Sequence, residues 1–365
     1  MGPRRPAPGL PTRLAYNLRL PLRLDARRFD LVVGFDFDGC FLPRPGDPPF
    51  VVSLKGIAAD EQRFETGVPK ARLRAQAALE AWNVHRADGV VVTSRYSRGW
   101  ARRAYGAPRG RTAVVPEGLD LDRWGLDGDD APGAGKPTSG DGGPLTILSV
   151  ARQYRRKNTA ALIEATARLA RRGLPVRLRV VGGGPELERL RALAARSGLG
   201  DRVRLPGEIP SDAVSREYRN ADVFCLPSLQ EGFGIVYLEA MASGLPVVAC
   251  RAGAAPEVVP HGETGLLCEP GATADLVRSL RRLLTDPVLR REMGERGRRR
   301  AARYGWPRVA GRFLSACREI LRPGGPGCSA ADERKMLGSF SDGPTTADTG
   351  DRGRRPHGTR PVPSS

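Results

Sequence analysis

The sequence predicts an α/β protein with parallel sheets, and three observations lead to that fold class. Short runs rich in β-branched residues alternate with segments of helical periodicity, which is typical of βαβ units. The helical segments stop at Gly173, Gly198 and Gly244, and glycine is the preferred residue in a left-handed helix cap. A Gly-, Pro- and Asp-rich stretch interrupts the alternation, so we expect two doubly wound domains joined by a linker.

The second half of the chain shows the alternation most clearly. Strands are predicted in LTILSV, VRLRVV, RVRLPG, ADVFCLP and LPVVAC, and helices in NTAALIEATARLARRG, PELERLRALAARSG, GIVYLEAMASG and ATADLVRSLRRLL. We assign residues 144–305 to this domain and residues 127–143 to a flexible linker. Residues 323–365 are polar and rich in Pro and Gly, which predicts a disordered tail.

The first half, residues 1–126, alternates less evenly. Strands are predicted in FDLVVGFD, PPFVVSLKG, ADGVVVTS and TAVVPEG, and helices over 70–86 and 97–105, while the first dozen residues are expected to lack regular structure. Both domains are therefore Rossmann-like. Because ligands bind at the carboxyl ends of the strands in such sheets, two domains that face each other would enclose a binding cleft.

The net charge of +19 suggests attraction to nucleic acid or to an anionic membrane surface. Only five of the 59 Lys and Arg residues are Lys, and no basic stretch is interleaved with aromatic residues. We therefore favour a compositional preference for Arg over specific nucleic-acid binding. Weak contact with an anionic membrane surface stays open.

Cysteine usage and hydropathy indicate a cytoplasmic protein. The six Cys residues are scattered and form no C-x-x-C pair, which predicts reduced, mostly buried thiols rather than a disulfide framework or a zinc site. No apolar stretch is long enough to cross a bilayer, and Pro and Arg interrupt the basic N-terminus, which argues against a signal peptide. Peripheral attachment at the inner membrane face is the open alternative.

The stretch FDLVVGFDFDGC, residues 29–40, has three interpretations. Asp36 and Asp38 could be the nucleophile and the acid/base of a haloacid-dehalogenase-type phosphatase. They could also hold a divalent metal on a nucleotide diphosphate, as in one class of sugar transferases. The third interpretation is a buried strand that ends in an acidic turn, with no chemistry of its own.

The phosphatase interpretation needs further residues that the chain supplies only in part. Thr93 or Ser94 could provide the hydroxyl that follows a second strand. The acidic cluster at 127–130, however, lies in the predicted linker with no apolar strand before it, and Cys40 stands where Thr or Val is usual. This interpretation is therefore only a remote alternative.

The segment LPSLQEGFGIVYLEAMASG holds the most informative group of residues. Glu231 lies in a loop after a predicted strand, and Gly232, Phe233 and Gly234 lead into a helix that carries Glu239 on its apolar side. Glycines let the backbone approach a ligand, and the free N–H groups of a helix start favour an anion. The alternatives are a structural, partly buried Glu239 and a solvated Glu231.

A nucleotide sugar suits this arrangement, because it has hydroxyls at both ends and a diphosphate in the middle. Positive charge for the phosphates is present in SVARQYRRKN, where Arg152 follows the first strand of the domain and Lys157 precedes the next helix. A solvated basic turn is the alternative for Arg155, Arg156 and Lys157.

The second half resembles the donor domain of retaining GT-B glycosyltransferases of family four, often called group 1. The resemblance covers about residues 144–322 and rests on SVARQYRRKN, VVGGGP, ADVFCLPSLQEGFGIVYLEAMASGLPVVA and VVPHGETGLLCEP, which occur in this order. The segment YGWPRVAGRFLSACREIL resembles the last helix of that family, here at 306–322, which crosses back to the first domain.

The resemblance implies a role for each matching residue. Arg152 and Lys157 would bind and stabilise the leaving diphosphate, Glu239 would hold the ribose hydroxyls, and Glu231 would hold the hydroxyls of the transferred sugar. Gly232 and the backbone N–H groups of Phe233 and Gly234 would lie near the sugar and the phosphate. It also implies retention of anomeric configuration without a metal or another cofactor. The acceptor, whether a glycan, a lipid-linked sugar or a small molecule, is not specified.

The first half resembles the family less closely. Glu117 stands in place of the Asn of the usual Asn-Gly-Val-Asp turn, and the expected opening strand with its Gly-rich loop is not found, so we expect a shortened first domain. Asp36 and Asp38, at the end of a strand, and Lys55 are the candidates for contact with the acceptor. The sequence therefore predicts a GT-B glycosyltransferase, and the alternative is a degenerate transferase that binds nucleotide sugar without turnover.

Overall fold

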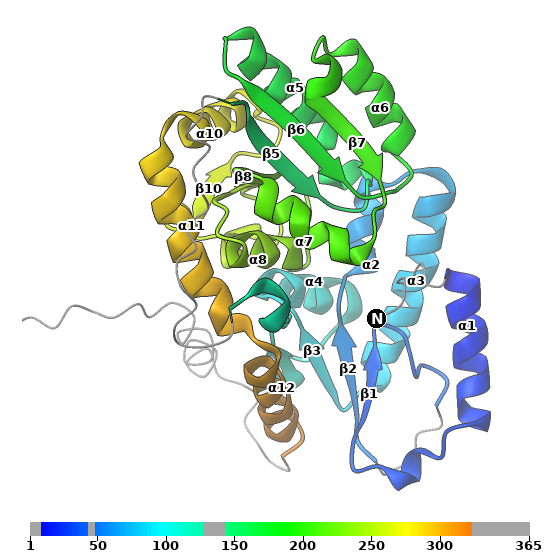
Figure 1. The fold of residues 1–365 in the computed structure, drawn as a ribbon. Coiled ribbons are helices and arrows are strands. Elements are labelled where there is room, and N and C mark those ends of the chain that lie inside the picture. The colour runs from blue at the N-terminus through cyan, green and yellow to red at the C-terminus, as the bar shows by residue number, and fades with distance from the viewer. Residues whose placement is uncertain (1–8, 43–47, 127–142, 323–365) are drawn as a thin grey trace, which may run out of the picture. The chain divides into compact units, whose positions relative to one another are not determined.

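The computed structural model describes residues 9–42, 48–126 and 143–322. The predicted tail and all of the predicted linker except Gly143 lie outside the described residues, as does the acidic cluster at 127–130. All described residues belong to one compact unit, Met1–Ser329. Within it are two parallel sheets, each with its own helices (Figure 1), which confirms the predicted fold class.

The first sheet has four parallel strands in the order β1-β2-β3-β4. They are β1 (Val32–Phe35), β2 (Phe50–Leu54), β3 (Gly89–Val92) and β4 (Thr112–Val114). The accompanying helices are α2 (Ala58–Glu61), α3 (Gly67–Arg86) and α4 (Arg95–Tyr105). Every residue of β2 and β3 is buried, as expected for parallel strands covered on both faces.

The N-terminal helix corrects one prediction. The first dozen residues were expected to lack regular structure, yet α1 (Leu10–Arg19) begins at Leu10 with a proline in its first turn, a position that proline favours. Polar contacts hold this helix in place: Arg13 and Asn17, one turn apart, bind the segment after β1. An apolar periodicity search does not detect a helix that is attached in this way.

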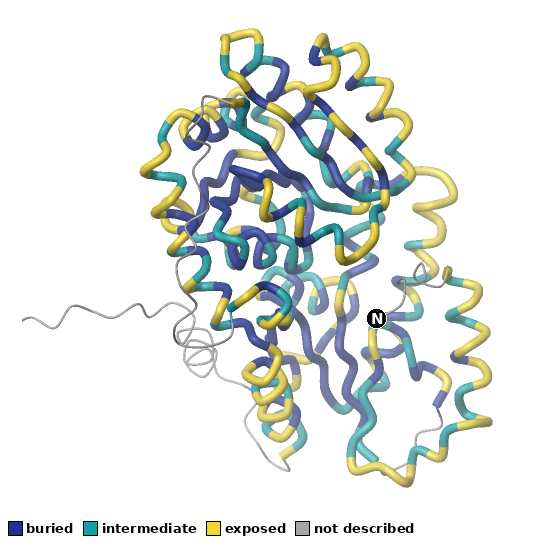
Figure 2. The backbone as a smooth tube through the Cα atoms, viewed as in Figure 1, coloured by how far each residue is buried: buried dark blue, intermediate teal, exposed yellow. Residues whose placement is uncertain are grey.

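The second sheet has six parallel strands in the order β10-β9-β8-β5-β6-β7. They are β5 (Leu145–Val150), β6 (Val176–Val181), β7 (Val203–Gly207), β8 (Val223–Leu226), β9 (Val247–Cys250) and β10 (Gly265–Cys268). Numbered along this domain, the order is the 3-2-1-4-5-6 of a Rossmann sheet, whose switch point lies between β5 and β8. Figure 2 shows the strands buried beneath more exposed helices.

The helices of this domain are α5 (Thr159–Arg171), α6 (Leu187–Arg196), α7 (Ser211–Asn220), α8 (Ile235–Ala242), α9 (Ala255–Val258), α10 (Thr273–Thr285) and α11 (Pro287–Ala301). Gly173, Gly198 and Gly244 have φ of 81°, 75° and 74°, which confirms the predicted left-handed caps. Short 3-10 turns include η5 (Asp122–Trp124) and η6 (Arg155–Lys157).

Several elements of the second domain were not among those predicted, and β10 and α7 are two of them. β10 lies within VVPHGETGLLCEP, a motif of the resemblance in which no strand is predicted. α7, with the sequence SDAVSREYRN, has too few apolar residues to show a helical stripe. Tertiary contacts decide both: β10 completes the sheet edge beside β9, and Tyr218 of α7 is fully buried.

The last described helix, α12 (Trp306–Ile320), packs on the first sheet rather than on the second. Its Val309, Ala316 and Cys317 share a core cluster with Val51 and Val91 of β2 and β3. Figure 1 shows α12 beside β3, far along the chain from it. Among the described residues, no helix is both long and apolar enough to cross a membrane.

Candidate active site

An ion pair at the carboxyl ends of β5 and β8 is the centre of the candidate site. Lys157 Nζ lies 2.6 Å from Glu231 Oε1, and Ser228 Oγ donates to the same oxygen at 2.7 Å. Both side chains of the pair are nearly buried, with 12 % and 10 % of their surface exposed. The structure thus brings together two predicted residues that lie 74 positions apart, at the switch point where such sheets bind ligands.

The two loops that carry this pair are bonded to each other. Leu229 N donates to the carbonyl of Arg156 at 2.8 Å. Lys157 ends the turn η6, and the next residue, Asn158, has a left-handed φ of 56° before α5 begins. Asparagine tolerates this conformation better than most residues. The lysine is therefore held by a tight turn rather than at the end of a free loop.

Glu231 keeps one oxygen available. Its Oε1 accepts from both Lys157 and Ser228, while no donor to Oε2 is found in the part of the chain that the structure describes. The backbone of Glu231 is fixed from a third loop, because Ala254 N donates to its carbonyl at 2.9 Å. A carboxylate held in this way can accept further hydrogen bonds without moving.

The start of α8 presents unused backbone N–H groups. Within the described ranges, the N–H groups of Phe233 and Gly234 have no acceptor. Gly234 has φ of 91°, and an added Cβ would lie 2.6 Å from the ring of Tyr237, so a side chain is excluded there. Free N–H groups and the helix dipole together make this turn suitable for a phosphate.

Glu239 lies about one turn along α8 and is partly buried. Its Oε2 accepts a hydrogen bond from the hydroxyl of Tyr218 at 2.9 Å. Burial, and then the charge of Glu239, raise the pKa of Tyr218 well above its usual value, so this hydroxyl remains a donor at any physiological pH. Tyr218 is itself fixed between Phe224 and Trp124. Sequence reasoning did not find Tyr218, because α7 was not predicted.

Arg152 lies at the exposed end of β5, and its guanidinium is 5.7 Å from the centre of the Tyr154 ring. No ion pair to Arg152 is found within the described ranges. The turn VVGGGP packs against the same loop: a Cβ on Gly184 would lie 2.6 Å from the backbone of Gln153. Glycine is therefore required where the two strand-end loops approach each other.

The predicted acceptor-side residues are bound to neighbours in the first domain. Asp38 accepts from Arg13 at 2.8 Å and from Asn17 at 2.9 Å, and Asp36 lies 3.5 Å from Arg13. Asp36 also accepts from Lys55 N at 2.9 Å, while burial raises its pKa. The Lys55 ammonium pairs with Glu117 at 3.0 Å. The aspartates thus tie α1 and β2 to the end of β1.

Several residues from the first domain contact the loops that carry Gly232 and Lys157, and sequence reasoning did not assign them to the site. Thr93, Ser94 and Ser97, at the start of α4, all donate to the carbonyl of Gly232. Glu61 of α2 lies 3.1 Å from Arg156, next to Lys157, and its burial raises its pKa. The available signal was weak: two hydroxyl residues after a strand, and a glutamate in a helix of one turn.

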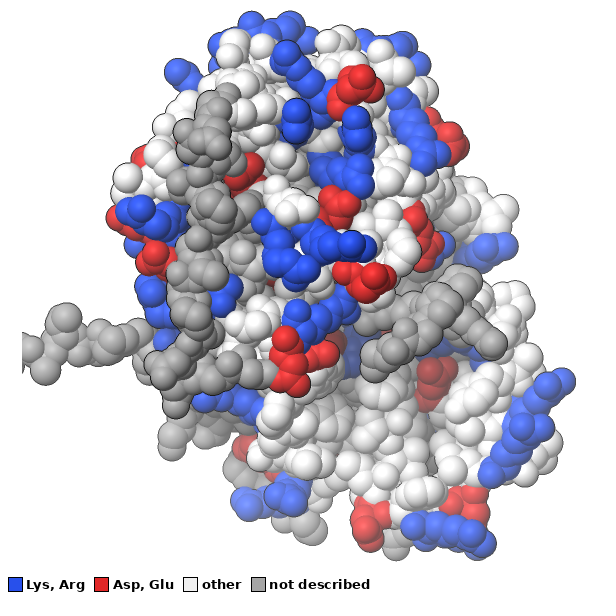
Figure 3. Space-filling view, viewed as in Figure 1, with Lys and Arg blue, Asp and Glu red and all other residues white. Residues whose placement is uncertain are grey.

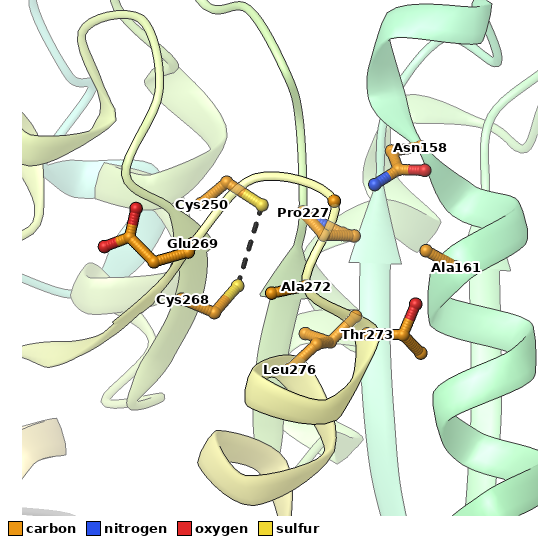
Figure 4. Close-up of a pocket in the computed structure, with 10 residues that line it drawn as sticks. Asn158, Ala161, Pro227, Cys250, Cys268, Glu269, Ala272, Thr273 and Leu276 are labelled. Atoms are coloured by element: carbon orange, nitrogen blue, oxygen red, sulfur yellow. Dashed lines mark hydrogen bonds between the residues drawn. The ribbon is translucent and has the colours of Figure 1, made fainter.

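The described residues hold no group of metal ligands, and their thiols are buried. In the part of the chain that is described, no three His, Cys, Asp or Glu side chains are grouped as metal ligands. The five described cysteines are buried, as predicted, and are free thiols. Figure 4 shows two of them, Cys250 and Cys268, with their sulfurs 3.6 Å apart beside a cavity of about 120 Å³. This cavity is too small for a nucleotide sugar.

Charged residues are spread over the visible surface. Figure 3 shows Lys and Arg over both domains with Asp and Glu between them, rather than one continuous basic stripe. This distribution agrees with a general preference for Arg in the composition.

Comparisons with known proteins match both domains. A family model described as Glycosyltransferase Family 4 matches residues 1–123, and one described as Glycosyl transferases group 1 matches residues 136–300. A GDP-mannose-dependent alpha-(1-6)-phosphatidylinositol monomannoside mannosyltransferase of Mycolicibacterium smegmatis is 36 % identical over 58 % of this chain and 57 % of its own length. A D-inositol 3-phosphate glycosyltransferase of Nocardia farcinica is 36 % identical over 63 % of this chain and 52 % of its own length.

The chain therefore spans between half and two thirds of the length of these curated relatives. Among solved structures, a sucrose-phosphate synthase from Thermosynechococcus elongatus has a TM-score of 0.71 at 26 % identity and covers 85 % of this chain and 78 % of its own. Anabaena HepE in complex with UDP and glucose has a TM-score of 0.66 at 22 % identity, covering 86 % and 84 %. With both domains matched in order, the chain belongs to the GT-B glycosyltransferases of family four, group 1.

Proposed function

We propose that the protein transfers a sugar from a nucleoside-diphosphate sugar to an acceptor hydroxyl, with retention of the anomeric configuration. One observation carries the proposal: the Lys157–Glu231 pair lies at the carboxyl ends of β5 and β8, beside the free N–H groups at the start of α8. Along the chain, Glu231 would bind the sugar, the N–H groups of Phe233 and Gly234 the diphosphate, and Glu239 the ribose hydroxyls. This is the order of the parts of a nucleotide sugar.

The ribose end of the donor would bind at Glu239. Its carboxylate is fixed by the Tyr218 hydroxyl, and a carboxylate is the natural acceptor for two neighbouring hydroxyls. The diphosphate would lie against the N–H groups of Phe233 and Gly234. Arg152, exposed at the end of β5, can reach phosphate oxygens with two parallel hydrogen bonds.

Lys157 would act at the leaving group. An ammonium has three N–H donors, and Glu231 accepts only one of them. The remaining donors can bind a phosphate oxygen whose charge grows as the bond to the sugar breaks, and a fixed positive charge stabilises that state most. Lysine, arginine and the helix dipole supply the positive charge in this proposal, so it requires neither a metal nor another cofactor.

The free oxygen of Glu231 would hold the transferred sugar. Oε2 can accept from sugar hydroxyls while Oε1 stays with Lys157 and Ser228. The charge that binds the sugar and the charge that binds the diphosphate are therefore linked through one side-chain pair. Such a link fixes the sugar relative to its leaving group, which is the geometric requirement for transfer.

The acceptor would enter from the first domain, beside Lys55 and the ends of β1 and β2. The named relatives act on an inositol phosphate and on a phosphatidylinositol mannoside, and we propose an acceptor that also offers a sugar or polyol hydroxyl, in a glycan, a lipid or a small molecule. The phosphatase alternative has no support, because Asp36 and Asp38 are bound by Arg13 and Asn17.

An anionic membrane surface is a second proposed partner, and it would place the protein peripherally at the cytoplasmic face. A groove of about 660 Å³ over the start of β6 and β7 is lined by Arg177, Arg179, Arg202 and Arg204, with Glu217 paired to Arg179. Co-sedimentation with vesicles that contain phosphatidylglycerol, against phosphatidylcholine alone, tests this. Equal sedimentation of Arg177→Glu and wild-type protein would show that this groove does not bind the membrane surface.

The enzymatic proposal is tested by titration and turnover together. GDP and UDP are titrated calorimetrically, and then GDP-mannose and UDP-glucose are incubated with the protein and release of the nucleoside diphosphate is measured with and without inositol. Binding with turnover is expected. Binding without turnover of any donor would favour the degenerate transferase, and no binding of either nucleotide would contradict the proposal itself.

A further inference from the structure

The carbonyl of Gly232 receives an unusual set of hydrogen bonds from the first domain. Ser94 Oγ donates to it at 2.6 Å, Ser97 Oγ at 3.0 Å and Thr93 Oγ1 at 3.2 Å. A carbonyl oxygen has two lone pairs, so three donors saturate it. The three hydroxyls come from one short segment, the junction of β3 and α4, and reach across 135 to 139 positions of sequence.

The hydroxyls are themselves held in place. Thr93, Ser94 and Ser97 are 3 %, 2 % and 1 % exposed. Ser94 is the N-cap of α4: its Oγ accepts from Ser97 N at 3.0 Å, so its own hydrogen is available for Gly232. The cap that starts the helix thus also orients the donor to the other domain.

The peptide that receives these bonds also carries the N–H of Phe233, which has no acceptor within the described ranges. The C=O of Gly232 and the N–H of Phe233 belong to the same planar unit and point in opposite directions. Hydroxyls that fix the carbonyl toward the first domain therefore fix the N–H on the opposite side. They also polarise the peptide, which makes this N–H a stronger hydrogen-bond donor.

We infer that Thr93, Ser94 and Ser97 are positioning residues for the donor: by binding the Gly232 carbonyl they aim the Phe233 N–H at the diphosphate of the nucleotide sugar. The inference rests on the proposed function. It gives the first domain a part in donor binding, in addition to the acceptor side that sequence reasoning assigned to it.

A second contact between α4 and the second domain supplies a matched control. Glu257 of α9 accepts from Arg95 N at 2.9 Å and from Tyr96 N at 2.8 Å, in the first turn of α4. It joins the two domains with two hydrogen bonds but does not touch the Gly232 peptide. Glu257→Ala therefore removes a contact between the domains without removing a hydrogen bond to the Gly232 carbonyl.

The first experiment is calorimetric titration of GDP and UDP. Ser97→Ala is the main variant, since Ser94→Ala would also remove the helix cap. Loss of one neutral hydrogen bond is expected to weaken nucleotide affinity roughly three- to tenfold, and Thr93→Val combined with Ser97→Ala somewhat more. Thr93→Ser, which keeps the hydroxyl, and Glu257→Ala should each change affinity less than about twofold.

Two results would overturn the inference. Unchanged affinity in Ser97→Ala, with normal binding by the wild type, contradicts it while leaving the proposed function intact. Equal losses in Ser97→Ala and Glu257→Ala show that only domain contact matters. Failure of the wild type to bind GDP or UDP contradicts the proposed function and the donor role of these hydroxyls together.

A second experiment does not depend on nucleotide. The chain contains two Gly-Phe peptides, Gly34-Phe35 and Gly232-Phe233. Labelling glycine with ¹³C at its carbonyl and phenylalanine with ¹⁵N therefore gives two NMR correlations, one of them an internal reference. The Gly232-Phe233 signal should shift in Ser97→Ala and stay in Glu257→Ala, while Gly34-Phe35 stays in both. An unshifted signal in Ser97→Ala would show that the hydroxyl does not hold this peptide.

Discussion

Both sheets place charged residues at the carboxyl ends of their strands, but the two sets are arranged differently. In the first domain, Asp36 and Asp38 after β1 are bound by Arg13 and Asn17 of α1. In the second domain, Glu231 after β8 is bound by Lys157 through one oxygen only. The first set ties secondary-structure elements together, whereas the second leaves hydrogen-bonding groups for a ligand.

The difference shows that a motif and its position do not define a site. A strand-end acidic pair after an apolar run looks catalytic, and the same pair becomes structural when a preceding helix supplies its partners. What marks the candidate ligand site is a group of fixed atoms with unused hydrogen-bonding capacity: one carboxylate oxygen, two backbone N–H groups and an exposed arginine. Variants of Lys157, Arg13 and Glu239 test this distinction.

The largest effect is expected in the second domain. Lys157→Ala should lower the turnover of a nucleotide sugar by a factor of about 100 or more, because a fixed positive charge at the leaving group is lost. Donor affinity should fall less than turnover. Steady-state kinetics measure both, and Arg155→Ala, an exposed neighbour in the same turn, is the control. Equal turnover in Lys157→Ala and Arg155→Ala would show that Lys157 does not act at the leaving group.

The next effect is expected in the first domain, on stability rather than on binding. Arg13→Ala leaves Asp36 and Asp38 without their guanidinium partner, so the free energy of unfolding should fall by about 2 kcal/mol. Urea denaturation measures this change. Arg168→Ala, which removes an exposed pair with Glu164, should cost less than about 1 kcal/mol. If Arg13→Ala instead weakened GDP binding at unchanged stability, the proposed contrast between the domains would be wrong.

Glu239→Ala should weaken GDP or UDP binding by about tenfold, as expected for loss of a charged hydrogen-bond acceptor. Tyr218→Phe keeps the carboxylate but removes the hydroxyl that fixes it, and it should cause a smaller loss. Calorimetric titration ranks the two. If Glu239→Ala binds both GDP and UDP as tightly as the wild type does, the ribose binds elsewhere.

The last prediction concerns the pH dependence of stability at a buried group outside the site. Burial raises the pKa of Glu80 to about 8 in the folded chain, against about 4.5 when unfolded. Between these values the folded state holds a proton that the unfolded state releases, so stability should fall as pH rises from about 5 to 8. Glu80→Gln, whose side chain does not ionise, should flatten this slope. If the free energy of unfolding depends on pH in the same way in Glu80→Gln and in the wild type, the pKa of Glu80 is not raised in the folded chain.

The sequence by itself determined the fold class and most of the strands, and it predicted Glu231, Gly232, Phe233 and Gly234 as parts of one site. Periodicity shows α/β alternation because each strand and helix buries its own apolar side, which is a local property. The motif residues Arg152, Lys157, Glu231 and Glu239 could be named because they lie at predictable positions beside strands and a helix start.

The tertiary structure alone decided which of these groups are paired and which are free. Tyr218, Glu61 and the hydroxyls of Thr93, Ser94 and Ser97 come to the site from elements far away in sequence, and α1 turns an apparent catalytic pair into a structural one. Hydrogen-bond partners of this kind depend on distances between elements, and local sequence patterns do not determine those distances.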